Sequence, residues 1–152
     1  AIISGQVANP GLISRQKGFT TEIKESFPGI EIVDIRYSYD DEWVASKIVE
    51  EFLELYPELT GIYITGHGVK GVCQTLQKLG KDKTMHVIAN DFLEENLKWL
   101  KEGTINFLIG QDAALQVHSP VIILFQLLFD SKAPEKEYQY TDIVIRTKYN
   151  MG

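Results

Sequence analysis

Short apolar segments alternate with longer segments of helical period along the whole chain, and this alternation restricts the fold more than any other feature. Most of the predicted strands are rich in β-branched or aromatic residues and flanked by Gly, Asn or Asp. They span residues 1–4, 30–36, 61–65, 85–89, 105–109 and 141–147. The predicted helices span residues 12–27, 41–56, 68–79, 92–102 and 112–129. Repeated strand–helix units form right-handed crossovers. We therefore expect one domain, residues 1–152, with a three-layer α/β/α fold, a mainly parallel sheet and helices on both of its faces.

The predicted helix ends carry residues that commonly begin or stop helices. Pro28 follows the first helix, and Asp40 or Asp41 can cap the second. Gly80 and Gly103 stand where a C-terminal glycine is expected. The proline at position 120 in the last helix predicts a kink or a later helix start.

Composition excludes several classes of protein. The chain has 15 basic and 21 acidic residues, a net charge of −6, and its basic residues are too sparse for a phosphate-binding surface. The lone Cys73 cannot form an internal disulfide and lies at an apolar helical position, which favours a core residue. The most apolar stretch, residues 121–129, contains Gln126 and is too short to cross a bilayer, so we expect no membrane contact. The chain begins on a strand without a signal-peptide pattern, which indicates a mature chain or an excised piece.

Polar side chains gather in the loops that follow the predicted strands. Ligands of open parallel α/β sheets bind at this edge, beyond the carboxyl ends of the strands. A guanidinium, an imidazole, carboxylates, carboxamides and two tyrosines together match the donors and acceptors of a sugar or similar small polar molecule. The candidate ligand-binding residues are Arg15, Tyr39, His67, Asn90, Asp91 and Gln111.

Each of these candidates also has a purely structural interpretation. Arg15 can be a solvated helix residue, and Asp91 or Asn90 can be the N-cap of the next helix. Gln111, like the neighbouring aspartate, carries the same capping ambiguity. His67, between two glycines, can simply form a tight turn before a helix. Position alone leaves both interpretations open.

Sequence patterns of catalysis and of cofactor binding are lacking. The chain has no glycine-rich dinucleotide or triphosphate loop and no serine nucleophile elbow. Its histidines lie on separate predicted elements without metal-ligand spacing. We therefore expect no catalytic residues, no metal and no cofactor, and we predict that the protein is not an enzyme.

Several segments, taken in order, resemble the C-terminal lobe of lac-repressor-family regulators and of type I periplasmic sugar-binding proteins. IISGQVANPGLISRQKGF contains the R-x-x-G-F/W signature at Arg15, Gly18 and Phe19. GIYITGHGVKGVCQTLQKLG is similar to the family's stretch that leads from a strand into an apolar helix. HVIAND resembles its V-x-G-F/Y-D strand end, with Asp91 at the aspartate. FLIGQD resembles the crossing to the other lobe, and TDIVIRTKYN the terminal strand.

The resemblance implies roles for individual residues. Arg15 would donate hydrogen bonds to ligand hydroxyls, Asp91 would accept from a pair of them, and Gln111 would lie at the hinge between two lobes. Two departures from the family pattern stand out. Gly66 and His67 replace the usual Asn-Asp, and Asn90 replaces the usual aromatic before the aspartate. Either an unusual ligand for the family or degenerate recognition would account for both.

The resemblance also implies a larger assembly. The ligand would be held between this lobe and an N-terminal lobe, and the helix in residues 111–131 would belong to the opposite lobe. The first hypothesis is the effector-sensing lobe of a cytoplasmic, homodimeric transcription regulator that contacts DNA only through a separate N-terminal domain. The second is a lobe of an extracellular or periplasmic sugar receptor of a transporter. The third is a small enzyme on a flavodoxin-like sheet.

Overall fold

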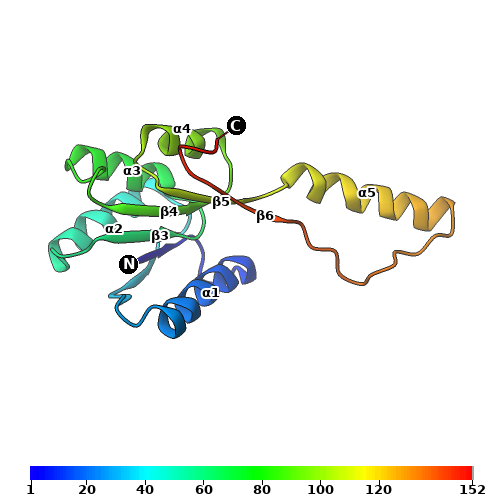
Figure 1. The fold of residues 1–152 in the computed structure, drawn as a ribbon, viewed down its shortest axis with the longest axis horizontal. Coiled ribbons are helices and arrows are strands. Elements are labelled where there is room, and N and C mark those ends of the chain that lie inside the picture. The colour runs from blue at the N-terminus through cyan, green and yellow to red at the C-terminus, as the bar shows by residue number, and fades with distance from the viewer. Residues whose placement is uncertain (152) are drawn as a thin grey trace.

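Strands and helices alternate through residues 1–151, the part of the chain that this computed structural model describes (Figure 1). The strands are β1 (Ile2–Ser4), β2 (Ile35–Tyr37), β3 (Gly61–Ile64), β4 (His86–Asn90), β5 (Phe107–Gln111) and β6 (Ile143–Arg146). The helices are α1 (Pro10–Ser26), α2 (Glu42–Leu55), α3 (Val69–Lys78), α4 (Glu94–Glu102) and α5 (Ala113–Phe129). The predicted α/β alternation is confirmed.

The six strands form one sheet in the order β2-β1-β3-β4-β5-β6. All neighbouring pairs are parallel except β5 and β6, which are antiparallel. The β5–β6 pair is in register from Leu108–Arg146 to Gln111–Ile143, so the last residue of β5 lies beside the first residue of β6. This is a mostly parallel α/β fold, as the alternation predicted.

Capping residues, some of them predicted, account for several of the helix ends. Asp41 caps α2 by accepting from Val44 N at 2.8 Å, and Asn9 accepts from two amides at the start of α1. Gly80 and Gly103 both adopt positive φ, as expected of glycines that follow helices. α5 begins at Ala113 with Pro120 inside it, so the alternative of a late start is wrong.

Several predicted boundaries were wrong, and two of the differences, in β2 and β5, follow from strand pairing. β2 starts at Ile35 rather than residue 30, because its only partner, β1, is three residues long and extends no further. β5 spans 107–111 rather than 105–109, because its register with β4 begins at the pair Ile88–Phe107. α4 starts at Glu94, two residues later than predicted, with Leu93 at the N-cap.

The core lies on one side of the sheet. Right-handed crossovers place α2, α3 and α4 on the same face, and α2 packs against α3. The side chains of Phe52, Val72, Leu76 and Leu100 are fully buried there against the strands. Cys73 is also fully buried in this core, and burial raises the pKa of its thiol well above the ordinary value, so it is an inert core residue.

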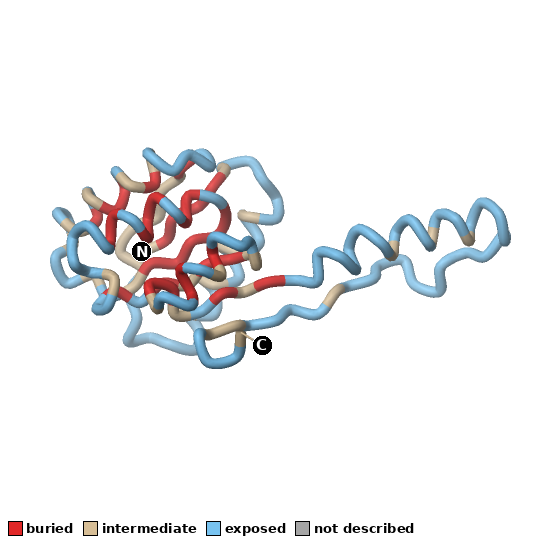
Figure 2. The backbone as a smooth tube through the Cα atoms, turned by 90° about the horizontal axis from the view of Figure 1, so that it is seen from above, coloured by how far each residue is buried: buried red, intermediate tan, exposed pale blue. Residues whose placement is uncertain are grey.

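Helices lie on both faces of the sheet, as expected, but the opposite face is covered only in part. α1 alone lies on it, and none of its residues is fully buried (Figures 1 and 2). α5 does not pack on this face either. It leaves the end of β5 and points away from the rest of the molecule, and residues 130–142 lead back beside it to β6. We call residues 112–142 the arm and the rest of the described chain the α/β body.

Candidate functional site

The loops at the carboxyl ends of β1–β5 meet at one edge of the sheet, the edge from which the arm extends (Figure 1). Arg15 projects from the second turn of α1 toward this edge and forms a bidentate pair with Asp91. Its Nη2 donates to Asp91 Oδ1 at 2.9 Å and its Nη1 donates to Oδ2 at 3.2 Å. Nη1 also donates to the Thr65 carbonyl oxygen at 2.8 Å. These three bonds join α1 to the ends of β3 and β4.

Asp91 lies in an uncommon backbone conformation. Its φ is +72°, in the left-handed region that Asp and Asn tolerate better than most residues. The buried side chain of Asn96 holds this turn by donating to the carbonyl oxygens of Asn90 at 3.1 Å and of Asp91 at 3.0 Å. The turn directs the Asp91 carboxylate to the edge of the sheet, where the side chain remains 46% exposed.

Neither Asp91 nor Asn90 caps α4. Leu93 occupies the N-cap position, and no side chain accepts from the first amides there. The capping interpretation of both residues is therefore wrong, and their side chains take part in other contacts. The amide of Asn90 donates to the Tyr63 hydroxyl at 3.1 Å and to the Ile64 carbonyl oxygen at 3.0 Å, and Asn90 is buried.

Tyr63 is a site residue that sequence reasoning missed. Its ring packs against Phe19 of α1 with centroids 4.4 Å apart, and burial raises the pKa of its phenol. Because the hydroxyl accepts from Asn90 and stays neutral, its own hydrogen is available for a further acceptor. The alternation of side chains along β3 could have placed Tyr63 on the sheet face that α1 covers. Its position relative to the residues of the neighbouring strands follows only from the strand register.

Two pockets flank the polar residues at this edge. One, of about 180 Å³, is lined by Arg15, Tyr63 and Asn90 together with Ile109, Gly110, Gln111 and Ile143. The other, of about 80 Å³, is lined by residues that include Gly66, His67, Asn90, Asp91 and Asn96. Asn90 lines both pockets. The larger pocket opens where α1, the end of β5 and the start of β6 meet.

The structure brings five of the six candidates to these pockets. Arg15, Asn90 and Gln111 line the larger pocket, and His67, exposed in its turn, lines the smaller one together with Asn90 and Asp91. Tyr39 lines neither pocket. It is 61% exposed at a positive φ of 54°, in the turn that follows β2.

Asp40, beside Tyr39, is a second residue that sequence reasoning missed. The sequence offered either Asp40 or Asp41 as the cap of α2, but Asp41 is the cap and Asp40 turns toward the edge. Its carboxylate lies against Gly5 so closely that a Cβ on that glycine would overlap it. The left-handed φ of 61° at Asp40 makes this approach possible, and nothing in the residue pattern signals it.

Two kinds of feature are absent from the described residues. Within residues 1–151 no three His, Cys, Asp or Glu side chains gather in a way that could hold a metal ion. Likewise, no helix in that range combines the length and apolarity needed to span a membrane. What the edge presents is a carboxylate, a guanidinium, a carboxamide and a phenol at fixed positions, a set that can hydrogen-bond a neutral polar ligand.

The fold and this edge define a class: an open α/β lobe with a polar site at the carboxyl ends of its strands. A family profile described as the periplasmic binding protein domain matches residues 1–132. The chain therefore belongs to the periplasmic binding protein domain family. None of the curated proteins matches it.

Solved structures share the fold across the whole chain. GanP, a glucose-galactose binding protein from Geobacillus stearothermophilus, has a TM-score of 0.90 at 20% identity, over 99% of this chain and 53% of its own. A transporter solute binding protein from Burkholderia graminis, in complex with D-arabinose, has a TM-score of 0.87 at 27% identity, with the same coverage of 99% and 53%. A proposed LacI transcriptional regulator from Bacteroides fragilis has a TM-score of 0.82 at 26% identity, again over 99% and 53%.

The chain thus spans about half the length of these proteins. The resemblance that the sequence motifs suggested is confirmed at the level of the periplasmic-binding-protein-like fold, which both sugar-binding proteins and a regulator share. Its narrower form, membership of the lac-repressor family, is not established by these comparisons.

Proposed function

We propose that this chain forms one wall of a sugar-binding cleft. Asp91 accepts hydrogen bonds from a pair of neighbouring hydroxyls, while Arg15 donates to one of them and orients the carboxylate. Tyr63 contributes its free hydroxyl hydrogen from the floor of the pocket. Gln111 reaches the ligand from the point where the arm begins.

The observation that carries this proposal is the Arg15–Asp91 pair. A bidentate pair leaves further lone pairs on both carboxylate oxygens, so Asp91 can accept from a ligand without losing its partner. Its turn is held by Asn96, which means that little ordering is left for the binding step. Related solved proteins are bound to D-arabinose and to α-D-tagatopyranose, which supports a monosaccharide as the ligand class.

We further propose that the cleft serves a solute receptor of a sugar transporter. Several of the similar solved structures are solute binding proteins of transporters, the Burkholderia graminis protein among them, and others, such as GanP, are sugar-binding proteins. A second lobe, facing this one across the carboxyl edge, would complete the cleft, as about half the length of those proteins is not represented in this chain. The cleft would close as both lobes contact the sugar.

A transcription regulator is the second candidate, favoured by the likeness to the Bacteroides fragilis protein over 99% of the chain. In that case the sugar would be an effector, and the regulator would act on DNA in the cytoplasm through a segment outside these 152 residues. Both candidates use the same site and differ in what the closed cleft contacts.

Ligand-observed NMR titration of the 152-residue chain with D-arabinose, D-glucose, D-galactose and D-tagatose tests the site. We expect weak binding of at least one sugar, because one wall of the cleft acts alone. Arg15→Gln and Asp91→Asn should each weaken binding by about 10-fold or more, roughly 1.4 kcal/mol, as each removes a charged hydrogen-bonding group. Asparagine is chosen because it tolerates the positive φ of Asp91.

Lys17→Gln and Glu94→Gln are the matched controls. Each removes the same charge from the same helix or the same loop region, yet neither side chain lines a pocket at the edge. We expect both controls to bind like the parent chain. Unchanged affinity in Arg15→Gln and Asp91→Asn, or the absence of binding to every sugar, would refute the assignment.

A further inference from the structure

The turn between β2 and α2 has a backbone conformation that its residues disfavour. Tyr39 has a φ of 54° and Asp40 a φ of 61°, both in the left-handed region. The amide of Asp41 donates to the Ser38 carbonyl oxygen at 3.0 Å and closes a four-residue turn with positive φ at both central positions, as in a type I′ turn. Asparagine and glycine are the residues that favour these positions, so a tyrosine and an aspartate there reduce stability.

Ser38 holds this turn against the end of β1. Its side chain is fully buried, and its amide donates to the Ser4 carbonyl oxygen at 2.8 Å. Its hydroxyl also donates to that oxygen, at 3.4 Å. The body therefore fixes the position of Asp40 at the edge before any ligand binds. Backbone strain that the surrounding structure maintains in this way is typical of ligand-binding and other functional sites.

Two glycines make room for the Asp40 carboxylate. A Cβ on Gly5, the residue that follows β1, would overlap Asp40 Oδ1, and a Cβ on Gly66, just beyond β3, would lie 3.6 Å from the same atom. The Leu12 methyl groups lie beside both glycines and offer an apolar contact for the C–H groups of a sugar ring. The carboxylate thus occupies the space over the ends of β1 and β3 that side chains at positions 5 and 66 would fill.

Asp40 and the Arg15–Asp91 pair lie on either side of Gly66. Arg15 donates to the carbonyl oxygen of the preceding residue, Thr65, and Asp91 lines the same small pocket as Gly66. β1, β3 and β4 are neighbours in the sheet. The two carboxylates are therefore separated by one to two strand spacings, roughly 5–10 Å. A single sugar ring with its substituents covers that span.

The Asp40 carboxylate also carries a charge to this edge. Arg15 neutralises Asp91, whereas the ion pairs formed within residues 1–151 do not include Asp40. Closing a cleft over a lone carboxylate removes water from it, which is unfavourable unless the ligand brings a compensating charge. A hydroxyl brings a hydrogen bond alone. An ammonium group brings the opposite charge and donates charge-assisted hydrogen bonds, so it is the better complement.

We propose that Asp40 is a further ligand-binding residue and that it selects a sugar with a protonated amino group. The hydroxyls of this sugar bind Asp91 and Arg15 as in the proposed function, on which this inference rests. The ammonium group of the same molecule donates to Asp40 over Gly5 and Gly66. The site then distinguishes an amino sugar from the neutral sugar with the same ring by the charge of one substituent.

NMR titration of the 152-residue chain with matched pairs of sugars tests the proposal. The pairs are D-glucosamine with D-glucose and D-galactosamine with D-galactose, and the N-acetyl derivatives serve as uncharged amides. We expect at least one amino sugar to bind about 10-fold more tightly than its neutral counterpart, because the hydrogen bond to Asp40 is charge-assisted. The N-acetyl derivative should lack this gain. The amide signals of Gly5 and Gly66 should shift with the amino sugar, which locates the ammonium group.

Asp40→Asn should abolish the preference for the amino sugar and leave the affinity for the neutral sugar unchanged. Asparagine also tolerates the positive φ. Asp41→Asn is the matched control, since it removes the same charge one residue further on. The Asp41 side chain accepts from Val44 N at the start of α2, and asparagine caps helices equally well. This control should retain the preference.

A double substitution separates ligand binding from support of the fold. Asparagine and glycine suit the two positive φ values, so Tyr39→Asn combined with Asp40→Gly should raise the midpoint of thermal unfolding. The same variant should lose the preference for the amino sugar. A lower midpoint would mean that these residues serve the fold, and it would overturn the proposal.

The remaining outcomes distinguish this inference from the proposed function. Equal affinity for amino and neutral sugars, or a preference that survives Asp40→Asn, would overturn the role of Asp40 alone, if Asp91→Asn still weakens binding of the neutral sugar. Binding of the amino sugar that depends on Asp40 but not on Asp91 would instead refute the proposed function and keep the assignment of Asp40. Absence of binding to every sugar would overturn both.

Discussion

In the α/β body the large apolar side chains are enclosed, and in the arm they are not. Phe52, Ile64 and Leu108 of the body are fully buried, while Val117, Leu128 and Phe129 of the arm are 66–73% exposed (Figure 2). Both regions have regular secondary structure, and α5 is as long as α1. The difference teaches that the body folds around its own core, whereas the arm carries apolar surface for a contact that the body does not supply.

A phenylalanine-to-alanine substitution in each region tests this contrast most strongly. Phe52→Ala should lower the free energy of unfolding by about 3–5 kcal/mol, because it removes a fully buried ring and leaves a cavity. Phe129→Ala, the same change at a 73% exposed position, should alter it by no more than about 0.5 kcal/mol in dilute, monomeric protein. Urea unfolding followed by circular dichroism measures both. Equal losses would mean that the arm is part of the body's cooperative core.

Two glycine substitutions compare how closely the helices pack on the two faces of the sheet, α3 on one face and α1 on the other. At Gly71 of α3 an added Cβ would overlap the Glu42 carbonyl oxygen of α2, so Gly71→Ala should destabilise the protein by about 1–3 kcal/mol. At Gly18 of α1 nothing lies within 4 Å of an added Cβ. Gly18→Ala should therefore stabilise the protein by about 0.5–1 kcal/mol, through helix propensity alone. Thermal unfolding of the two variants gives the signs, and a stability loss at Gly18 would show that α1 is packed more closely than described.

The smallest effect is expected at the edge where body and arm meet. Arg15→Gln should change the free energy of unfolding by less than about 1 kcal/mol, because the pair with Asp91 is partly exposed to solvent. Lys17→Gln on the same helix serves as the reference in the same urea titration. A loss well above that value would assign Arg15 to the support of the fold, and its effect on sugar binding would then be indirect.

The repeating strand–helix pattern, the capping Asp41 and the helix-ending glycines were enough to predict the α/β class. Strand boundaries were less predictable, because the extent of β2 depends on how much of β1 lies beside it. The partial cover of the sheet face that carries α1 escaped prediction for a similar reason. Isoleucines at 109 and 145 look like core residues in the sequence, and only the position of α5 shows that no helix of this chain covers them.

The candidate site was predictable where a residue belongs to the segments at or after the carboxyl end of a strand. Arg15, Asn90 and Asp91 were found from the loops at the carboxyl edge, and the structure brings all three together. Tyr63 and Asn96 were missed because their contribution depends on contacts between separate elements, the hydroxyl reached by Asn90 and the carbonyl oxygens reached by Asn96. The positive φ of Asp91, which decides where its carboxylate points, also has no sequence signal beyond the tolerance of aspartate.

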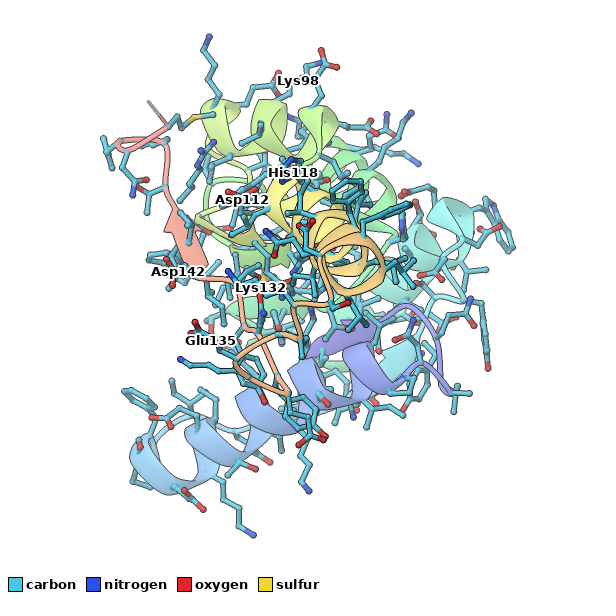
Figure 3. The ribbon with its side chains drawn as sticks, turned by 90° about the vertical axis from the view of Figure 1, so that its right-hand side faces the viewer. Lys98, Asp112, His118, Lys132, Glu135 and Asp142 are labelled. Atoms are coloured by element: carbon cyan, nitrogen blue, oxygen red, sulfur yellow. The ribbon has the colours of Figure 1, made fainter. Side chains whose placement is uncertain are left out.

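The register of β5 with β6 has a mechanical consequence. The chain leaves the body at Gln111 and re-enters it at Ile143, and these two residues are paired neighbours in the sheet, with Asp112 and Asp142 just beyond them (Figure 3). The arm is therefore attached through two connections side by side. It can swing about the line that joins them, but turning about its own long axis would pull the two connections in opposite directions. Motion between arm and body is thereby restricted mainly to hinge bending about the axis that joins the two connections.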